Sequence, residues 1–336
     1  MNKVLVLGGT GALGVYFVEE LISKGYEVDI VSVDCTGSES PHVKYIRENA
    51  KNNDFLIRVL KASYDAVIDF MLYETEEFKL RYLTLLKSTK HYIFLSSYRI
   101  YADSKKPITE SSDRLLEIAD ESLLCDPDDY SLYKARQEDM LRSSGFKNWT
   151  ILRPSITFSK RRFQLTVLEA NILMYRIRKG KTVVLPKEAM GIQSTMTWAK
   201  DSAKMVIPLL CDESAFGETY TVATGEHHTW REIAGIYKEI CGLKYIEADT
   251  EDFLNIIAPD NPHIRRQLLY DRFFNRAINN AKILRASGLT QSDLTLLKDG
   301  LKHEIDALPP NTDFGGDTCD ANLRMDEYLR SVGIED

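Results

Sequence analysis

Two hydrophobic patterns alternate along the first half of the chain. Val4 to Leu7 form an unbroken apolar run, which is typical of a strand buried on both faces. From residue 15, apolar side chains recur at helical spacing with charged side chains between them. Strands that alternate with helices in this way predict a parallel sheet with helices on both faces. Further strands are expected at residues 27–33, 43–46, 66–70, 92–95 and 149–153, with helical patterns at 54–62 and 74–87.

The regular alternation ends near residue 157. Later segments are mostly helical in pattern, with a strand expected at 219–223 and helices expected at 165–178, 198–211, 229–241, 279–286 and 291–305. We therefore expect an α/β fold, a doubly wound parallel sheet with a smaller C-terminal α+β lobe. The sheet domain should span 1–157 joined by 193–215, and the lobe should span 158–192 and 216–336. The polar tail after Pro310 is expected to be ordered in part at best.

Three glycines separate the first strand from the first helix. Gly8 permits a sharp turn, Gly11 lets a pyrophosphate approach the backbone, and Gly14 lets the helix pack close to the sheet. The helix N-terminus adds free N–H donors and a positive dipole end. This context predicts a dinucleotide-binding turn rather than a purely structural one. Its residues would be Gly8, Thr10, Gly11, Ala12, Leu13 and Gly14.

Other candidate cofactor residues follow the ends of later strands. Asp34 lies about twenty residues past the turn, where an acidic side chain usually holds a ribose 2′-hydroxyl, although an aspartate there also serves as a turn or cap residue. No arginine follows Asp34 directly, so NAD is favoured, with NADP left open. Phe70 and Ser97 also follow strands, and the carboxyl ends of parallel strands share one crevice.

The candidate acid–base pair is Tyr130 and Lys134. Residues four apart share a helix face, and a lysine ammonium beside a tyrosine favours the phenolate, which suits acid–base work near neutral pH. The same spacing to a lysine also occurs at Tyr101 and Tyr175, so the spacing alone does not identify the catalytic tyrosine. Only Tyr130 opens a helix that precedes the sixth strand and can return over the crevice. The alternative is a surface tyrosine with a solvated lysine.

Composition excludes several classes of function. The 336 residues are 44% hydrophobic and 28% charged, which is ordinary for a globular protein, and the net charge of -7 argues against a nucleic-acid partner. No apolar run approaches a membrane span, so no membrane partner is expected. Because Met1 leads directly into the first strand, no signal peptide is expected, and five scattered cysteines are typical of reduced thiols. We expect a cytoplasmic protein with no metal site.

Several motifs in order resemble the extended short-chain dehydrogenase/reductases. They are Gly-Gly-Thr-Gly-Ala-Leu-Gly at 8–14, Ser-Ser-Tyr-Arg-Ile-Tyr at 96–101, Thr109-Glu110, Tyr130 with Lys134, and Leu-Arg-Pro-Ser-Ile at 152–156. More narrowly, the chain is similar to the NAD-dependent epimerase/dehydratase group that acts on nucleotide sugars. The resemblance covers most of the chain and implies a Rossmann fold and a homodimer.

The resemblance also implies roles for individual residues. Ser97, Tyr130 and Lys134 would form a catalytic triad, with Lys134 also holding the nicotinamide ribose. The backbone from Pro154 to Ile156 would lie near the nicotinamide amide. Three departures from the family pattern stand out. The usual acidic residue is replaced by Ser32, the fourth strand ends in bulkier residues, and Tyr98-Arg99 stand where the 4,6-dehydratases carry Asp-Glu. Dehydration is therefore not expected.

A nucleotide sugar needs cations for its diphosphate. Candidates for substrate contact are Arg161, Asn171 and Arg265, although arginines on helices are usually solvated. The sequence favours an epimerase that uses Tyr130 as acid and base. A reductase of a keto-sugar or another carbonyl stays open. So does a nucleotide-binding scaffold or sensor without turnover.

Overall fold

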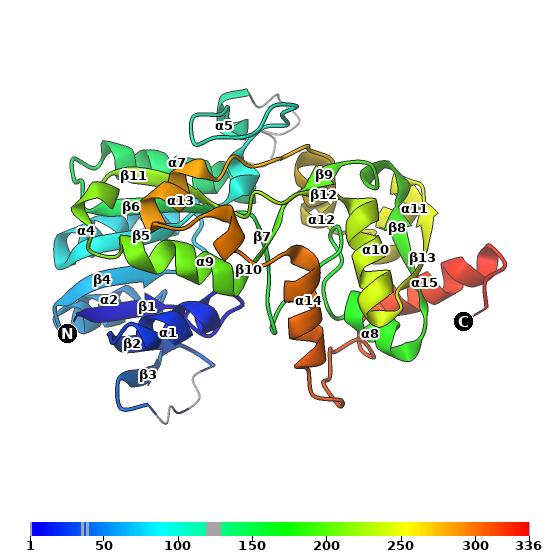
Figure 1. Ribbon diagram of the computed structural model, residues 1–336, viewed down its shortest axis with the longest axis horizontal. Helices are drawn as coiled ribbons and strands as arrows, with labels where there is room; N and C mark the ends of the chain where they lie inside the picture. The colour runs from blue at the N-terminus through cyan, green and yellow to red at the C-terminus, as the bar shows by residue number, and fades with distance from the viewer. Residues whose placement is uncertain (1, 35–36, 38–39, 119–128, 336) are drawn as a thin grey trace.

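Seven parallel strands form one sheet in the order β11-β6-β5-β4-β1-β2-β3 (Figure 1). The computed structural model describes residues 2–34, 37, 40–118 and 129–335. The order reverses between β1 and β4, so a crevice opens at the carboxyl ends of these two strands. The strands are β1 (Lys3–Leu7), β2 (Glu27–Ser32), β3 (Val43–Arg47), β4 (Tyr64–Asp69), β5 (Thr89–Leu95), β6 (Trp149–Pro154) and β11 (Glu218–Val222).

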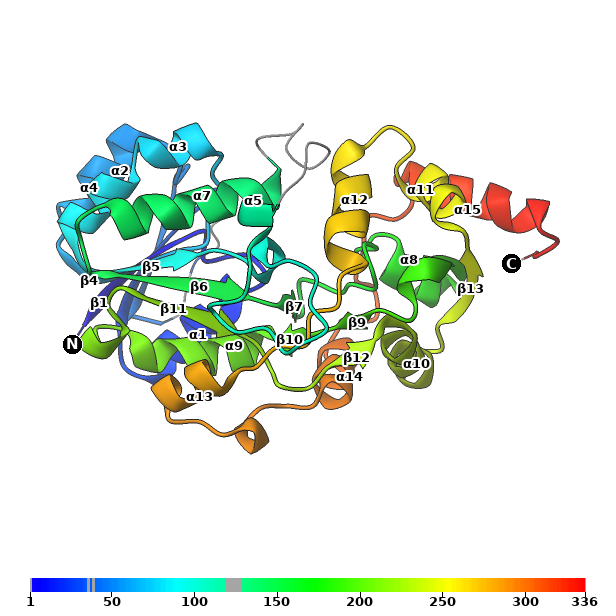
Figure 2. The same cartoon turned by 90° about the horizontal axis from the view of Figure 1, so that it is seen from above.

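Alternate residues of each strand enter two different cores, because successive side chains of a strand point to opposite faces. Val4 and Val6 pack on one face, and Leu5 and Leu7 pack on the other. Figure 2 shows the two helical layers on either side of the sheet. One layer contains α1 (Gly14–Ser23), α9 (Ala199–Val206) and α13 (Ala281–Ser287). The other contains α2 (Asn53–Leu60), α3 (Thr75–Lys79), α4 (Tyr82–Ser88) and α7 (Tyr130–Ser143). The short helix α5 (Leu115–Ile118) packs against α7.

The second lobe has its own core, built around three two-stranded sheets that pair β7 with β10, β8 with β13, and β9 with β12. These strands are β7 (Ile156–Phe158), β8 (Thr182–Pro186), β9 (Gln193–Ser194), β10 (Met196–Trp198), β12 (His228–Thr229) and β13 (Lys244–Ala248). The larger helices are α8 (Leu173–Lys179), α10 (Trp230–Cys241), α11 (Thr250–Ile257), α12 (Pro262–Gln267), α14 (Leu297–Asp306) and α15 (Asp320–Ser331). Within the described ranges, no helix combines the length and apolar character that a bilayer crossing requires.

The helix α14 joins the two lobes. Its Glu304 is buried and accepts hydrogen bonds from the Tyr16 hydroxyl of α1 and from the indole of Trp198, next to α9. Figure 1 shows α14 between the lobes. A buried carboxylate with two donors is well satisfied, so this contact orients the second lobe over the sheet.

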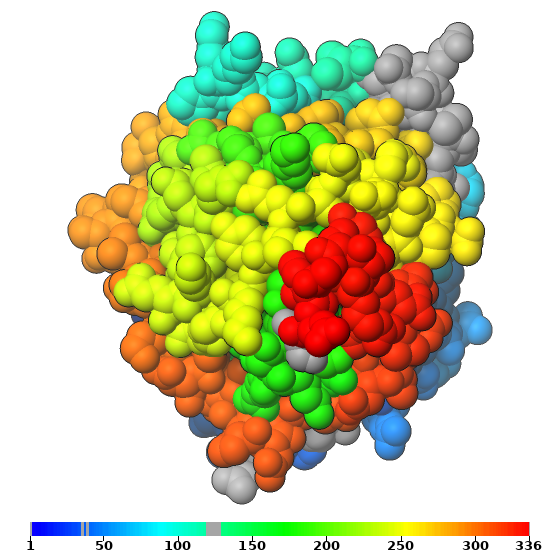
Figure 3. All heavy atoms as spheres, turned by 90° about the vertical axis from the view of Figure 1, so that its right-hand side faces the viewer, coloured from blue at the N-terminus to red at the C-terminus, as the bar shows by residue number. Residues whose placement is uncertain are grey.

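Several expectations differ from the structure. The strand β11 and the helix α13 pack with the sheet, although they lie within the range 216–336 that we expected to form the lobe. The helix expected at 165–178 begins only at Leu173. The tail after Pro310 is not a weakly ordered segment, because it contains α15, whose Met325 and Leu329 are buried in the second core. Figure 3 shows this helix in red against the surface of the lobe.

Candidate active site

The glycine turn after β1 is shaped by close backbone contacts. Gly8 has a φ of +77°, in the left-handed region that favours glycine. A Cβ at Gly14 would lie 2.6 Å from the backbone of Gly9, so α1 could not start so close to the sheet with any larger residue. A Cβ at Gly11 would meet only the Gly8 carbonyl oxygen, at 3.6 Å. The turn therefore needs glycine at 8 and 14 for its own geometry, whereas Gly11 leaves space beside the backbone.

That space belongs to a cavity of about 510 Å³ at the carboxyl ends of the strands. The volume is in the range of small-molecule sites. The cavity wall brings together most of the residues that the sequence singled out, namely Gly8, Gly11, Ala12, Leu13, Gly14, Phe70, Ser97, Tyr130, Pro154 and Ile156. The second lobe closes the cavity with Arg162, Gln164, Glu169, Gln267 and Arg272.

Tyr130 is the first residue of α7, and its position follows from the cap of that helix. The Asp129 carboxylate accepts a hydrogen bond of 2.9 Å from the Ser131 N–H, which satisfies one of the free donors of the first turn. The Tyr130 ring packs edge-on against Tyr133, with 5.4 Å between ring centroids. The guanidinium carbon of Arg99 lies 4.7 Å from the centroid of the Tyr130 ring. Tyr130 is therefore held between a helix neighbour and a cation.

Ser97 and Arg99 come from the loop that leaves β5. The Ser97 hydroxyl accepts a hydrogen bond of 3.2 Å from the Arg99 N–H and caps the short 3-10 helix η1 (Tyr98–Ile100). This turn folds the chain back, so that Ser97 and Arg99 both line the cavity with Tyr130. Ser97 was expected here. The role of Arg99 was missed, although its position two residues after Ser97 in the same loop was the available signal.

Lys134 lies behind the cavity wall. Its ammonium is fully buried, donates a 2.8 Å hydrogen bond to the Leu95 carbonyl and lies 4.8 Å from the centroid of the Phe94 ring. Burial lowers the pKa of Lys134 to about 8, against the opposing charges of Asp69 and Glu138. Leu95 lines the cavity, so Lys134 contacts the cavity wall through the Leu95 carbonyl.

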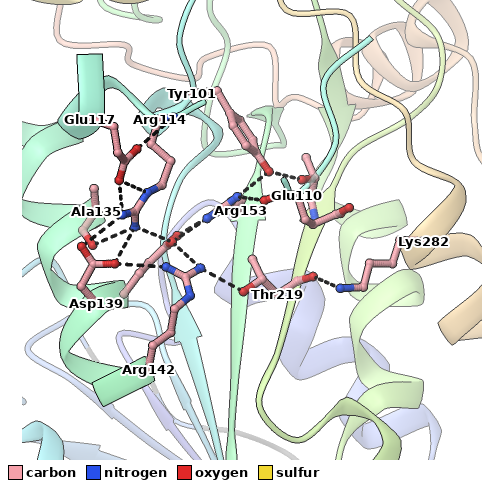
Figure 4. A network of polar contacts seen from close by, with 12 residues as sticks. Tyr101, Glu110, Arg114, Glu117, Ala135, Asp139, Arg142, Arg153, Thr219 and Lys282 are labelled. Atoms are coloured by element: carbon pink, nitrogen blue, oxygen red, sulfur yellow. Dashed lines mark hydrogen bonds and ion pairs between the residues drawn. The ribbon is translucent and has the colours of Figure 1, made fainter. Parts of the chain in front are cut away.

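A buried polar network fixes α7 against the sheet (Figure 4). Arg153 of β6 binds the Glu138 carboxylate at 2.9 and 2.6 Å and donates to the Tyr101 hydroxyl at 2.8 Å. Burial alone would raise the pKa of Glu138, but the charge and hydrogen bonds of Arg153 outweigh it and hold that pKa below its usual value. Arg142 of α7 also reaches Thr219 of β11, at 3.2 Å. The helix that carries Tyr130 and Lys134 is thus tied to two strands.

The residues near the end of β2 differ from those on the cavity wall. Ser32 is the last residue of β2, and its hydroxyl lies 2.7 Å from the Thr10 hydroxyl. Asp34 is exposed two residues further on, and its N–H donates to the Ser32 hydroxyl at 3.2 Å. The glycine turn, with its open space at Gly11, fits a pyrophosphate. Where the family pattern usually has a carboxylate at the end of this strand, the chain has the paired hydroxyls of Ser32 and Thr10.

The substrate-contact candidates lie apart from the cavity. Arg161 is exposed, Arg265 makes an ion pair with Glu251 at 2.8 and 2.6 Å, and the Asn171 amide lies 3.5 Å from the Cys319 sulfur. Among the described residues that form the wall, the cations are instead Arg99, Arg162 and Arg272. Sequence alone could not choose among neighbouring arginines, because the loops that carry them have no regular period.

Comparisons with known proteins agree on the fold. The chain is 24% identical over 248 residues to the chloroplast stem-loop binding protein of 41 kDa b from Arabidopsis thaliana, a match that covers 69% of this chain and 61% of that protein. A UDP-glucose 4-epimerase from Thermotoga maritima, solved with UDP-glucose, superposes with a TM-score of 0.68 at 18% identity, over 90% of this chain and 97% of that one. MoeE5, solved with UDP-glucuronic acid and NAD, gives 0.70 at 15% identity, over 91% and 98%.

The model of the NAD dependent epimerase/dehydratase family matches residues 4–222. This range begins in β1 and ends in β11, so it spans the whole seven-stranded sheet together with Ser97, Tyr130 and Lys134. The match covers more than half of the chain. The chain therefore belongs to the NAD-dependent epimerase/dehydratase family.

Proposed function

We propose that this protein is an NAD-dependent enzyme that epimerises a nucleotide sugar by hydride transfer, with Tyr130 as acid and base. One observation carries the proposal: Tyr130 and Ser97 line the same cavity as the glycine turn. A proton-transfer group and a dinucleotide phosphate site within one cavity are what hydride transfer at a sugar carbon requires. Structural neighbours bound to NAD and to nucleotide sugars support the proposal by analogy of fold.

The chain's own residues divide the work. The glycine turn and the N-terminus of α1 would hold the diphosphate of the cofactor, and Pro154 and Ile156, which line the same cavity, would lie near its nicotinamide as the family resemblance implies. When bound, NAD supplies the hydride acceptor and donor. Tyr130 removes the proton from a substrate hydroxyl and later returns it, while Ser97 donates a hydrogen bond to the same oxygen. Lys134 positions the end of β5 through the Leu95 carbonyl.

Two alternatives follow from specific observations. The hydroxyl pair of Ser32 and Thr10, in place of a carboxylate, favours a reductase that draws NADPH or NADH from solution. The relative named for stem-loop binding leaves open a binding protein in place of an enzyme. A stem-loop is a nucleic acid, and the net charge of -7 weighs against such a partner, so the binding protein comes second to an enzyme. Dehydration is not expected on chemical grounds, because Tyr98 and Arg99 carry no carboxylate.

The nucleotide that co-purifies with the protein distinguishes these functions. The purified protein is denatured, and the released small molecules are identified by mass spectrometry. We expect tightly held NAD, because an epimerase regenerates its cofactor in every cycle. An empty protein that binds NADPH from solution would indicate the reductase. An empty protein that binds neither dinucleotide would contradict the enzyme and favour the binding protein.

A further inference from the structure

One buried carboxylate beside the cavity makes ion pairs with three arginines. Asp271 lies 3.2 Å from the Nε of Arg99 and also makes ion pairs with Arg272 and Arg276. It belongs to η5 (Leu268–Arg272), a turn of π-helix, which is a geometry often found at functional sites. Asp271, Arg272 and Arg276 are each at most 2% exposed. Within the described part of the chain, the cluster of Asp271 with its three arginines therefore holds one negative and three positive charges.

Two neighbouring acids interact with this cluster but do not cancel its excess of positive charge. Asp129 interacts electrostatically with Arg99, and Glu169 does so with Arg272. Each carboxylate also pairs with a further arginine, Asp129 with Arg266 at 3.2 Å and Glu169 with Arg162 at 3.3 Å. A buried charge without a partner is costly, and an anionic ligand in the cavity would offset that cost. The cavity wall that contains Arg99 and Arg272 is thus suited to an anion.

Of the three arginines, Arg99 is the best placed to bind an anion in the cavity. Arg276 donates to the Tyr101 carbonyl at 2.7 Å, and Arg272 donates to the Thr166 carbonyl at 2.7 Å, so both are committed to the backbone. Among described residues, the two terminal nitrogens of Arg99 have no hydrogen-bond partner. The Arg99 side chain is 17% exposed and lines the cavity.

The location of Arg99 decides which part of a substrate it meets. Its guanidinium packs on the Tyr130 ring, so an anion bound there lies next to the proposed acid–base. Gln164 on the same wall has a buried side-chain oxygen without a partner, which suits a sugar hydroxyl. The contact therefore falls on the sugar that reacts.

We propose that Arg99, supported by Arg272, receives a carboxylate on the reacting sugar, so that the substrate is a nucleotide-linked uronic acid. The inference rests on the proposed function, because it assumes that Tyr130 acts on a nucleotide sugar. A planar guanidinium can bind a carboxylate with two parallel hydrogen bonds, which a neutral sugar cannot match. The nucleotide diphosphate is a second source of negative charge, and the experiment separates the two.

The test compares substrates that share a diphosphate and differ in the carboxylate. Binding to the protein with its NAD is measured by calorimetry for UDP-glucuronate against UDP-glucose, and for GDP-mannuronate against GDP-mannose. At least one uronate should bind roughly tenfold or more tightly than its neutral partner. R99Q should remove this preference and change the affinity for the neutral sugar less than about twofold, whereas R99K should keep part of it.

Controls separate a lost contact from a damaged fold. R58Q changes an exposed arginine on α2 and should leave every affinity unchanged. NAD affinity and melting temperature should be the same for R99Q and the wild type. Equal binding of uronate and neutral sugar, or an equal loss of both in R99Q, would overturn the inference and leave the proposed function standing. Binding of no nucleotide sugar would overturn the proposed function itself.

Discussion

Burial decides the protonation state of several side chains next to the sheet. His91 on β5 is fully buried, where its Nδ1 accepts a 3.0 Å hydrogen bond from the Cys211 N–H and its Nε2 lies 2.8 Å from the Thr150 hydroxyl. The Thr150 hydroxyl donates to the Ala215 carbonyl, so Nε2 carries the proton and the ring is neutral. Burial lowers the pKa of His91 to about 4, against the opposing charge of Asp212.

This pKa predicts a loss of stability in mild acid. Above the ordinary histidine pKa of about 6.5, both the folded and the unfolded protein hold a neutral ring. As the pH falls toward 4, only the unfolded protein gains the proton, so the free energy of unfolding should decrease by up to about 3 kcal/mol through this residue. Urea unfolding at pH 7 and pH 4.5 measures this decrease in the free energy of unfolding. H91Q should be less sensitive to pH, and parallel curves for both proteins would contradict the assignment.

Gly11 gives a prediction for the cofactor alone. Because a Cβ there meets only the Gly8 oxygen at 3.6 Å, G11A should fold normally, with a methyl group projecting where a pyrophosphate would approach. We expect roughly tenfold weaker NAD binding by calorimetry, with an unchanged melting temperature. G191A is the matched control, since a Cβ there would meet no atom within 4 Å. Unchanged NAD affinity in G11A would place the cofactor elsewhere.

At the scale of elements, α7 depends on its contacts more than on its own pattern. Glu138 is buried and pairs with Arg153, so its removal leaves a guanidinium without its carboxylate in the interior. We expect E138A to lower the free energy of unfolding by about 3–5 kcal/mol, as for other broken buried pairs. K302A, which removes an exposed pair with Asp306, should cost less than about 1 kcal/mol. Chemical denaturation compares both, and similar small losses would mean that the network does not fix α7.

The sequence predicted those elements whose period is strong and whose ends are marked. The strands β1 to β6 were predicted from short strand-like segments, and α10 was predicted to start at Thr229, which forms a capping box with Glu232 in the structure. The sequence pattern did not predict the elements that depend mainly on tertiary packing. The helix α15 is polar overall, and only its contacts with the second lobe bury Met325 and Leu329. Short strands such as β9 and β12 have two residues each and leave no periodic signal.

The residues of the candidate site likewise fall into those that the sequence could predict and those that it could not. Gly8, Ser97 and Tyr130 were predictable, because each follows a strand end or opens a helix at a recognisable motif. Arg272 could not be chosen over Arg265, because both follow weak patterns and only the fold turns one toward the cavity. Arg99 gains its role from Asp271, a residue 172 positions away that no local spacing connects to it.

At the scale of the whole molecule, the sheet domain exposes leucines on the helical layer that contains α3 and α4. Leu80 is 71% exposed and Leu83 is 36% exposed. Exposed apolar groups on one face are often covered by a partner, and the family resemblance implies a homodimer. Light scattering should give twice the mass of one chain, and the double substitution L80E/L83E should halve it. L323E, at a leucine of α15 that is 64% exposed, is the control. A wild-type monomer would contradict the expectation.

Replacement of Tyr130 by phenylalanine tests whether this residue is the acid and base of the reaction. Y130F removes the hydroxyl that transfers the proton and keeps the ring on which Arg99 packs. Turnover of the nucleotide sugars that the wild type accepts, starting with UDP-glucuronate and UDP-glucose, should fall by roughly 100-fold or more. NAD affinity and melting temperature should not change. If Y130F turns over substrate at the wild-type rate, Tyr130 is not the acid and base, and the proposed hydride-transfer mechanism is wrong.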